Sequence, residues 1–235
     1  MENFLRTRPE VRYGAPNADQ ILVNRQYLIG YSYLYRQARW ALELIDPSNS
    51  LIDIDDRLDT FRCDVRLPDM FHAELDDYRG MGYDRGHMVS SADRRGSEIL
   101  NSETFLLSNM SPQAADLNRR HWRLLEEAVR TLAESYVEVY VICGPLFLPG
   151  KSFRTIGEKM IAVPHAYYKS VLAENERGRM MLWSFIMPNE RTEGKIEDYR
   201  VSTTEVEKMA GLVLWPELRT DDVRKLKDQI PEMWE

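Results

Sequence analysis

Hydrophobic and polar positions alternate over several short stretches of this chain, a pattern that predicts β-strands. Residues 26–33 and 37–45 are rich in aromatic and β-branched side chains and are separated by a short connection, so we expect a hairpin. Residues 137–143 are almost continuously apolar and end at Gly144-Pro145, which is typical of a central buried strand. The strand-like pattern continues at 161–163, 167–172 and 180–187.

A helix is predicted between residues 118 and 134, where apolar positions recur at intervals of three, four and three residues. Asn118 begins this helix, and Glu126 and Arg130 lie along the edge of its apolar face. At about 100° per residue, these three polar side chains project from one side of the helix.

Shorter elements are predicted on either side of this helix. Residues 61–65 and 105–107 are candidate short strands, and Ser111-Pro112-Gln113 ends the second of them. Residues 202–205 have the spacing of a capping box and begin a further helix, and residues 221–230 have the composition of a charged surface helix.

The composition is that of an ordinary globular protein, with 235 residues, 43% of them hydrophobic and 29% charged. No linker-like break interrupts the chain, so we expect residues 1–235 to form a single domain. No run approaches the roughly 20 apolar residues that a membrane helix needs, and residues 1–6 lack the features of a secretory signal. We therefore expect an intracellular protein with no membrane partner, in which Cys63 and Cys143 are buried reduced thiols rather than a disulfide.

The net charge of −7 argues against a protein that coats nucleic acid through bulk electrostatics. The charge is unevenly distributed, however, because residues 79–130 hold eight Arg, no Lys and seven acidic residues. This segment carries +1 and the remainder −8, which allows a local arginine-rich site on an acidic body.

The run Asp84-Arg85-Gly86-His87 within this segment combines groups that suit phosphodiester hydrolysis. That reaction needs a base, a cation that neutralises the developing charge, and a route for protonating the leaving oxygen. His87 is the candidate base because the ordinary pKa of histidine lies near neutrality, although a lone histidine is more often structural. The other three histidines (His72, His121 and His165) lie in no comparable cluster of polar residues.

A magnesium ion would suit the helix that follows. Mg²⁺ takes oxygen ligands and keeps several waters, so the Asn118 carbonyl is a candidate ligand and Glu126 a candidate acceptor from water. The alternative for Asn118 is a plain helix N-cap, which its position favours. Zinc is disfavoured because the four histidines and two cysteines show no paired spacing of the usual kind.

Arg85 and Arg130 are candidates for contacting phosphate oxygens, with solvated charge or ion pairs to Asp84 or Glu126 as the alternative. Gly86 is expected to let the backbone turn freely beside His87, and Asp84 is expected to have a structural role. Asn109 precedes a proline turn and is a candidate for supporting the site.

Several segments together resemble the DNA/RNA non-specific endonucleases of the ββα-metal class, which carry a DRGH motif. They are residues 83–88, 104–109 and 112–113 with Asn118, Trp122 and Glu126. Within that family the chain resembles the endonuclease G branch, at Tyr13-Gly14 with Pro16, and at residues 143–149, 156–157, 162–164 and 187–189. The resemblance covers residues 13–218, which leaves 219–235 as a C-terminal surface helix and tail.

The resemblance implies an α+β, ββα-metal (His-Me finger) fold with a central, mainly antiparallel sheet flanked by helices. It also implies cleavage of DNA and RNA without sequence preference, 5′-phosphate products, and one Mg²⁺ that Mn²⁺ can replace. By position, His87 is the general base, Asn118 the metal ligand, and Glu126 orients a water ligand of the metal. Asn109 supports the site, Arg85 and Arg130 bind phosphate or stabilise the transition state, and Arg62 is a further phosphate contact.

Three expectations about context follow from the resemblance. Family members commonly dimerise, so we expect a homodimer. About a dozen residues precede Tyr13, so we expect a cytoplasmic protein, or a mitochondrial one if its N-terminus was trimmed. A cytoplasmic nuclease would harm its own cell, so we expect an inhibitor protein or an activating partner. The competing function is an inactive or regulatory nucleic-acid-binding module with the same fold.

Overall fold

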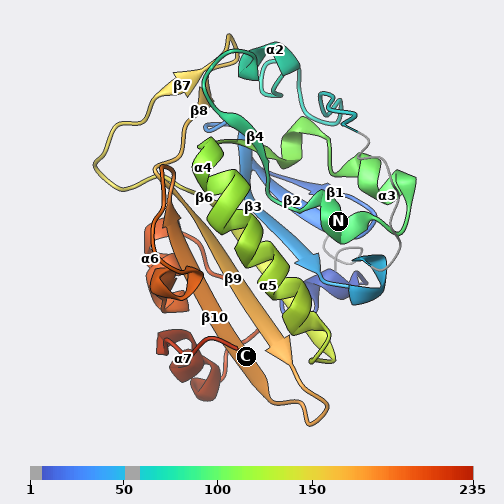
Figure 1. The fold of residues 1–235 in the computed structure, drawn as a ribbon, viewed down its shortest axis with the longest axis vertical. Coiled ribbons are helices and arrows are strands. Elements are labelled where there is room, and N and C mark those ends of the chain that lie inside the picture. The colour runs from blue at the N-terminus through green and yellow to red at the C-terminus, as the bar shows by residue number, and fades with distance from the viewer. Residues whose placement is uncertain (1–6, 51–58, 235) are drawn as a thin grey trace.

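The computed structural model describes residues 7–50 and 59–234. Residues 1–6, where the sequence predicts no secretory signal, lie outside the described range. A seven-stranded antiparallel sheet forms the centre of the molecule, with the strand order β1-β2-β3-β6-β9-β10-β11 (Figure 1). Its strands are β1 (Gln20–Val23), β2 (Tyr27–Ser32), β3 (Gln37–Leu44), β6 (Glu138–Leu146), β9 (Ala166–Glu174), β10 (Met180–Pro188) and β11 (Arg200–Val201).

The predicted hairpin and the predicted central strand are both confirmed. Strands β2 and β3 pair antiparallel, and β6 lies between β3 and β9 as the fourth strand of the sheet. The predicted strand at 61–65 is wrong, since this segment makes only an isolated bridge between Arg62 and Leu106. A single bridge leaves most of its backbone outside any ladder.

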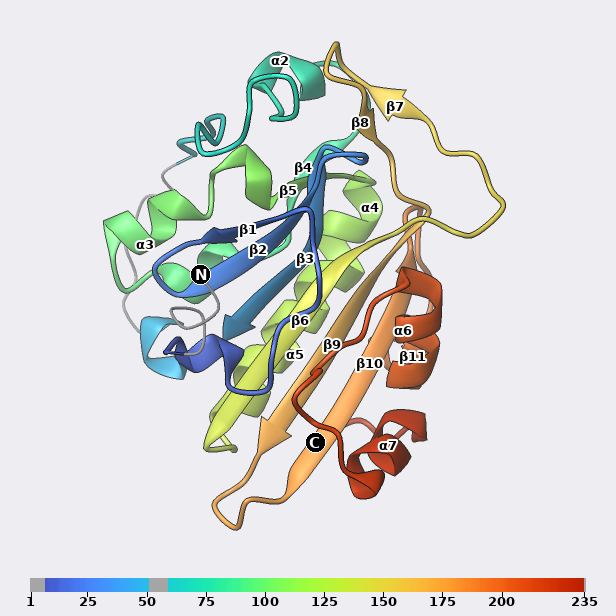
Figure 2. The same cartoon turned by 180° about the vertical axis from the view of Figure 1, so that it is seen from behind.

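Each face of the sheet is covered by a helix, as the opposite views in Figures 1 and 2 show. Alternate residues of a strand point to opposite faces, so Tyr167 and Val171 of β9 belong to the core beneath helix α5 (Arg123–Ala133). Tyr168 and Leu172 of the same strand belong to a second core, beneath helix α6 (Thr203–Ala210). The buried pattern of β9 therefore reflects apolar cover on both faces.

Two small ribbons lie outside the main sheet: β4 (Asp84–His87) with β5 (Met110–Gln113), and β7 (Thr155–Ile156) with β8 (Ile161–Ala162). The strand predicted at 105–107 is wrong, because the strand lies a few residues later and includes Pro112. Proline donates no hydrogen bond, but a two-stranded ribbon tolerates it because each strand has one unpaired edge.

The remaining helices surround these sheets. They are α2 (Leu75–Tyr78), α3 (Glu98–Glu103), α4 (Ala115–Leu117), a π-helical turn (Asn118–Trp122) and α7 (Asp221–Asp228), with 3₁₀ turns at Pro9–Val11, Pro47–Ser50, Ser91–Arg94, Leu107–Asn109 and Ile196–Tyr199. Over the part of the chain described, no helix has both the length and the apolar character needed to cross a membrane.

The long helix differs from its prediction at its start. One turn, α4, precedes Asn118, whose own backbone is helical (φ −56°, ψ −48°), so the alternative role of Asn118 as the N-cap is wrong. The capping prediction at the later helix is confirmed. The Ser202 hydroxyl accepts from the Glu205 N–H at 3.1 Å, and Gly211 ends α6 in the left-handed region at φ 62°.

Candidate active site

Strand β4 presents two sets of side chains to two sides because its residues alternate in direction. Arg85 and His87 share one side, where the Arg85 guanidinium carbon lies 4.1 Å from the centre of the Phe61 ring. The centroids of the Phe61 and His87 rings are 5.9 Å apart. Asp84 and Gly86 face the other side, where Asp84 bonds to Asn118 and Arg119 and Gly86 lies against the Gln113 side chain.

Gly86 is present because of a close approach rather than a turn. It lies within β4, opposite Ser111, and is not among the glycines with positive φ. A Cβ atom at this position would lie 2.2 Å from Oε1 and 2.6 Å from Cβ of Gln113. The expectation that Gly86 lets the backbone turn freely is therefore wrong, since the missing side chain is what lets β4 and β5 pack together.

Asn109 holds the chain immediately after His87. It is fully buried, its Oδ1 accepts from the Val89 N–H, and its Nδ2 donates to the carbonyls of Val89 and Thr104, each at 2.9 Å. The Asn109 carbonyl accepts from the Met88 N–H at 2.9 Å. These bonds fix the backbone after His87, and the edge-on contact between the His87 and Phe105 rings, 5.1 Å between centroids, restrains the half-buried imidazole.

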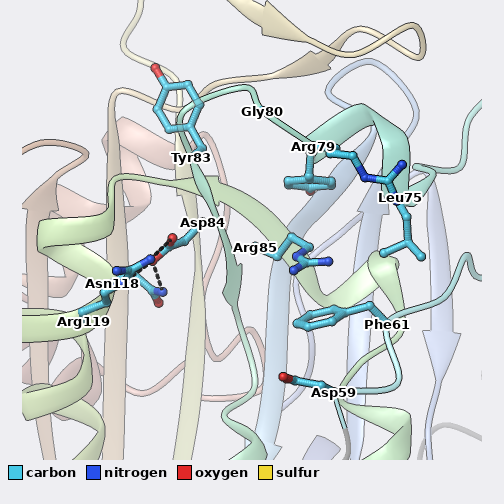
Figure 3. A pocket seen from close by; sticks show the side chains of 11 residues that line it. Asp59, Phe61, Leu75, Arg79, Gly80, Tyr83, Asp84, Arg85, Asn118 and Arg119 are labelled. Atoms are coloured by element: carbon cyan, nitrogen blue, oxygen red, sulfur yellow. Dashed lines mark hydrogen bonds and ion pairs between the residues drawn. The ribbon is translucent and has the colours of Figure 1, made fainter.

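Asp84 orients the side chain of Asn118. Its Oδ2 accepts from Asn118 Nδ2 at 2.9 Å, and Arg119 donates to both oxygens of the same carboxylate at 2.8 and 2.7 Å (Figure 3). Only the NH₂ of an amide can donate to a carboxylate, so the Asn118 carbonyl oxygen faces away from Asp84. Burial disfavours the charge on Asp84, but the bonds from Arg119 and Asn118 outweigh it and lower its pKa.

A cavity of about 680 Å³ opens beside these residues (Figure 3). Of the site residues that the sequence predicts, Arg85 and Asn118 line it. The other lining residues are Asp59, Phe61, Leu75, Tyr78, Arg79, Gly80, Tyr83, Asp84 and Arg119. The exposed arginines on its wall suit a polyanion.

Glu126 and Arg130 belong to a set of charged groups between α5 and the sheet. Burial raises the pKa of Glu126 to about 7, against the opposing effects of Lys169, Arg130 and a hydrogen bond with Ser90. Arg130 donates from Nη1 to Asp93 Oδ1 at 2.7 Å. The ion pair considered for Arg130 is therefore made, but with Asp93 instead of Asp84 or Glu126.

Arg62 lies in a separate groove of about 630 Å³. Its side chain is exposed, and Nη1 donates to the carbonyls of Thr60 and Ser102 at 3.0 and 2.9 Å. Arg25 and Arg66 line the same groove. Arg62 is thus close to Phe61 in sequence but does not line the 680 Å³ cavity.

The other histidines differ from one another. His121 bonds to Thr192 and Gly194, and His165 to Leu148 and Ser152, so both have partners at each ring nitrogen. His72 instead lies beside Glu74, Asp69 and Cys63, so the expectation that it has no comparable polar cluster is wrong.

Both cysteines are free thiols. Cys143 is buried as predicted, and burial raises the pKa of its thiol to about 12. Cys63 is half-buried, which corrects the expectation of two buried thiols.

The donors around the cavity are chemically suited to a hard cation. Asn118 offers a carbonyl oxygen, a ligand of the kind that Mg²⁺ and Mn²⁺ prefer, whereas both Asp84 oxygens already accept hydrogen bonds from Asn118 and Arg119. Among the described residues, the candidate metal clusters of three His, Cys, Asp or Glu side chains include none at this cavity. A cation here would therefore keep several of its waters, as Mg²⁺ usually does.

Comparison with known proteins identifies the family. The family model for DNA/RNA non-specific endonucleases matches residues 6–221. The chain belongs to this family. Human mitochondrial Endonuclease G is 36% identical over 221 residues, covering 88% of this chain and 73% of its own length. Nuclease C1 of Cunninghamella echinulata var. echinulata is 33% identical over 231 residues, covering 93% and 90%.

A solved structure supports the same assignment. A chain in the crystal structure of an EndoG/EndoGI complex, which concerns the mechanism of EndoG inhibition, superposes with a TM-score of 0.84 at 31% identity. The match covers 94% of each chain. The predicted family and the α+β fold with a mainly antiparallel sheet are thus confirmed, and this endonuclease is a hydrolase that acts on nucleic acid.

Two contributors to the site went unnoticed in the sequence. Arg119 clamps Asp84, and Phe61 stacks on Arg85. Arg119 is one of three adjacent basic residues, and no spacing distinguishes it, because its partner lies on a strand 35 residues earlier. Phe61 carries no polar group, so only the fold reveals its contact with Arg85.

Proposed function

We propose that this endonuclease hydrolyses DNA and RNA without sugar or sequence preference, using His87 as general base and one Mg²⁺, which Mn²⁺ can replace. The observation that carries the proposal is the bond from Asn118 Nδ2 to Asp84, 2.9 Å long. It turns a hard oxygen donor away from the carboxylate, on a residue that lines the same cavity as Arg85. The ion would bind Asn118 and supply positive charge to the phosphate.

In the proposed reaction, His87 takes a proton from a water molecule whose oxygen attacks phosphorus. The bond from phosphorus to the 3′-oxygen breaks, the 3′-oxygen takes a proton from water, and the phosphate stays bonded to the 5′-oxygen of the next nucleotide. Asn109 keeps the chain after His87 in place through its three side-chain hydrogen bonds. Glu126 accepts hydrogen bonds from water in its ionised form.

Three arginines are proposed to bind phosphate, and they differ in how many of their N–H groups already bond to other protein groups. Arg85 is exposed and held by the face of Phe61, which leaves its N–H groups directed at the cavity. Arg62 uses Nη1 for two carbonyls and would bind a phosphate further along the strand of nucleic acid. Arg130 uses Nη1 for Asp93, so it would bind phosphate through its other N–H groups.

A plasmid-nicking assay tests the proposal. Cleavage of supercoiled plasmid and of RNA is expected with Mg²⁺ or Mn²⁺, is expected to stop in EDTA, and should leave 5′-phosphate ends that a ligase joins without a kinase. Asn118→Ala should raise the Mg²⁺ concentration needed for half-maximal rate, because its carbonyl is the proposed ligand. Binding without any cleavage would favour an inactive or regulatory nucleic-acid-binding module instead.

We also propose a homodimer and a protein inhibitor or activating partner. Support for an inhibitor comes from the structural relative, which is a complex with EndoGI. Light scattering should give twice the 27.6 kDa mass of one chain, and a monomer at micromolar concentration would contradict the dimer. Protein purified under denaturing conditions and refolded should cleave faster per molecule than protein purified natively from its own cells, whereas equal rates would contradict a bound inhibitor.

We propose a cytoplasmic location, with a mitochondrial one as the alternative because the Endonuclease G relatives are mitochondrial. Immunofluorescence or fractionation of the source cells distinguishes the two.

A further inference from the structure

We propose that Cys63, His72 and Glu74 form a binding site for Zn²⁺, separate from the proposed magnesium site. A thiol sulfur, an imidazole nitrogen and a carboxylate oxygen from these residues all lie within 4.8 Å of one another. The imidazole Nε2 is 2.7 Å from Glu74 Oε1 and 3.3 Å from Asp69 Oδ1. Four side chains with metal-binding atoms thus come from a single segment, residues 63–74.

His72 is an unusual histidine for a purely structural role. The residue is 7% exposed, and its Nδ1 is buried with no hydrogen-bond partner among the described residues. Buried polar atoms are generally satisfied, and an imidazole nitrogen left without a partner is costly. His121 and His165 each have partners at both nitrogens, whereas His72 contacts Glu74 through Nε2 and has no partner at Nδ1 among the described residues.

The mixture of donors selects the class of metal. Thiolate and imidazole suit Zn²⁺, whereas Mg²⁺ takes oxygen ligands, so the ion that fits Cys63 differs from the ion that fits Asn118. Tetrahedral zinc with bonds of about 2.0 Å to nitrogen and about 2.3 Å to sulfur separates neighbouring donors by roughly 3.3–3.6 Å. The three donor atoms lie within 4.8 Å of one another, and Nε2 and Glu74 Oε1 are 2.7 Å apart, so side-chain rotations would have to bring the donors to that spacing.

Asp69 is the natural fourth ligand. Its carboxylate is 91% exposed and lies 3.3 Å from His72, so it can move toward the ion at little cost. Lys159 Nζ lies 3.7 Å from the same oxygen and is the one cation that the ion would have to displace from the described surroundings. An exposed pair of this kind contributes little stability, so the displacement is inexpensive.

The proposed zinc site lies between two segments that line the 680 Å³ cavity. Cys63 follows Arg62 and Phe61, and Glu74 immediately precedes α2, which lines the 680 Å³ cavity with Leu75 and Tyr78. Zinc would therefore tie one wall of the cavity to the segment that carries Phe61. Zinc binding to these side chains is independent of phosphodiester hydrolysis, so either claim can fail while the other stands.

Cobalt substitution tests the site in the full chain freed of metal by chelation. Co²⁺ bound to a thiolate gives a sulfur-to-metal charge-transfer absorption, which oxygen ligands at Asn118 cannot give. We expect this band to saturate at one equivalent of Co²⁺ and to disappear when Zn²⁺ is added. Asn118→Ala and Cys143→Ala should keep the band, and the second is the matched control because it removes the other thiol.

Cys63→Ser is expected to abolish the band, and His72→Gln to weaken Co²⁺ binding by more than about 100-fold, since removing a ligand costs more than removing a supporting partner. Zn²⁺ should raise the Tm of the unmodified chain and leave that of Cys63→Ser unchanged. A wild-type chain without the band, a band that survives in Cys63→Ser, or one lost in Cys143→Ala would each overturn the proposal. The wild-type spectrum decides the matter even if a variant fails to fold.

Discussion

Asp84 acts at the scale of single residues by fixing its neighbours. Its two oxygens accept three hydrogen bonds, one from Asn118 and two from Arg119. The two-point contact with Arg119 restrains the carboxylate, and the restrained carboxylate in turn selects one orientation of the Asn118 amide. The structural role expected for Asp84 is therefore to orient the Asn118 amide, which determines whether a cation would meet its oxygen or its nitrogen.

Asp84→Asn should raise the Mg²⁺ concentration needed for half-maximal cleavage by about 10- to 100-fold, the range for residues that support a metal ligand. The loss arises because an amide in place of the carboxylate no longer dictates which end of Asn118 it contacts. Titration of plasmid cleavage with Mg²⁺ measures the change. Asp221→Asn is the matched control, since Asp221 makes an exposed ion pair with Arg224 on α7. An unchanged Mg²⁺ requirement in Asp84→Asn would contradict the role of Asp84.

At the scale of elements, the ribbon of β4 and β5 and the helix after it carry most of the proposed site. Four pairs of residues, from Asp84 with Gln113 to His87 with Met110, set the ribbon's register. The ribbon needs a glycine at 86 because the Gln113 side chain occupies the space that a Cβ would take. His87 is placed by this packing, one residue further along the strand.

Gly86→Ala is expected to destabilise the protein by about 1–3 kcal/mol through overpacking, and to lower cleavage further by shifting His87. Gly150→Ala is the matched control: it adds a Cβ with nothing within 4 Å, so it costs only the strain of φ 75°, about 1 kcal/mol. Urea unfolding of both variants gives the comparison. Equal stability losses would show that the contact with Gln113 is unimportant.

The elements that follow from local patterns were predictable, and those that depend on distant partners were not. The hairpin, strand β6, helix α6 and its Ser202 cap all follow from periodicity and capping chemistry. Strand β5 was missed because its proline argues against a strand unless the ribbon edge is known. The turn before Asn118 and the π-helical turn after it carry no sequence signal, since neither changes the apolar spacing of α5.

In the candidate site, too, residues within a local motif were predictable and contacts between distant residues were not. His87, Asn118 and Glu126 are predicted by their resemblance to a known motif, and their catalytic roles stay predictions. The contacts that position them cross long stretches of chain, such as Asp84 with Arg119 or Arg130 with Asp93. No single-sequence pattern reports such pairs. The cluster around His72 was missed because its spacing is unlike that of common zinc motifs.

At the scale of the whole molecule, buried charges join the sheet to the helix layer. Glu43 of β3 pairs with Arg94 at 2.9 Å, both nearly inaccessible, and Lys169 of β9 lies 4.5 Å from the centre of the Trp122 ring. Partners of both signs keep these charges tolerable in the interior, but removing one would leave another uncompensated. One sheet includes strands from residue 20 to residue 201, and the single domain stays a prediction.

Stability is predicted to depend on pH through Glu126. Burial raises the pKa of its carboxyl group from 4.5 to about 7, so the folded state holds this proton more tightly than the unfolded state. Its contribution is complete below pH 4.5 and is lost as the pH rises through about 7. The free energy of unfolding is measured without metal as the pH rises from 4.5 to about 7. Over this range it should fall by about 1–3 kcal/mol less in Glu126→Gln than in the wild type, because glutamine does not titrate. Parallel pH profiles would contradict the raised pKa of Glu126 in the folded state.

The most direct test of the central claim is the cleavage rate of His87→Ala on supercoiled plasmid at saturating Mg²⁺. Removing the base should lower the rate by about 10²- to 10⁴-fold, with the fold and the affinity for DNA nearly intact. His165→Gln, which alters a histidine bonded to Leu148 and Ser152, should retain most of the rate. If folded His87→Ala keeps a tenth or more of the wild-type rate, His87 is not the general base and the proposed mechanism is wrong.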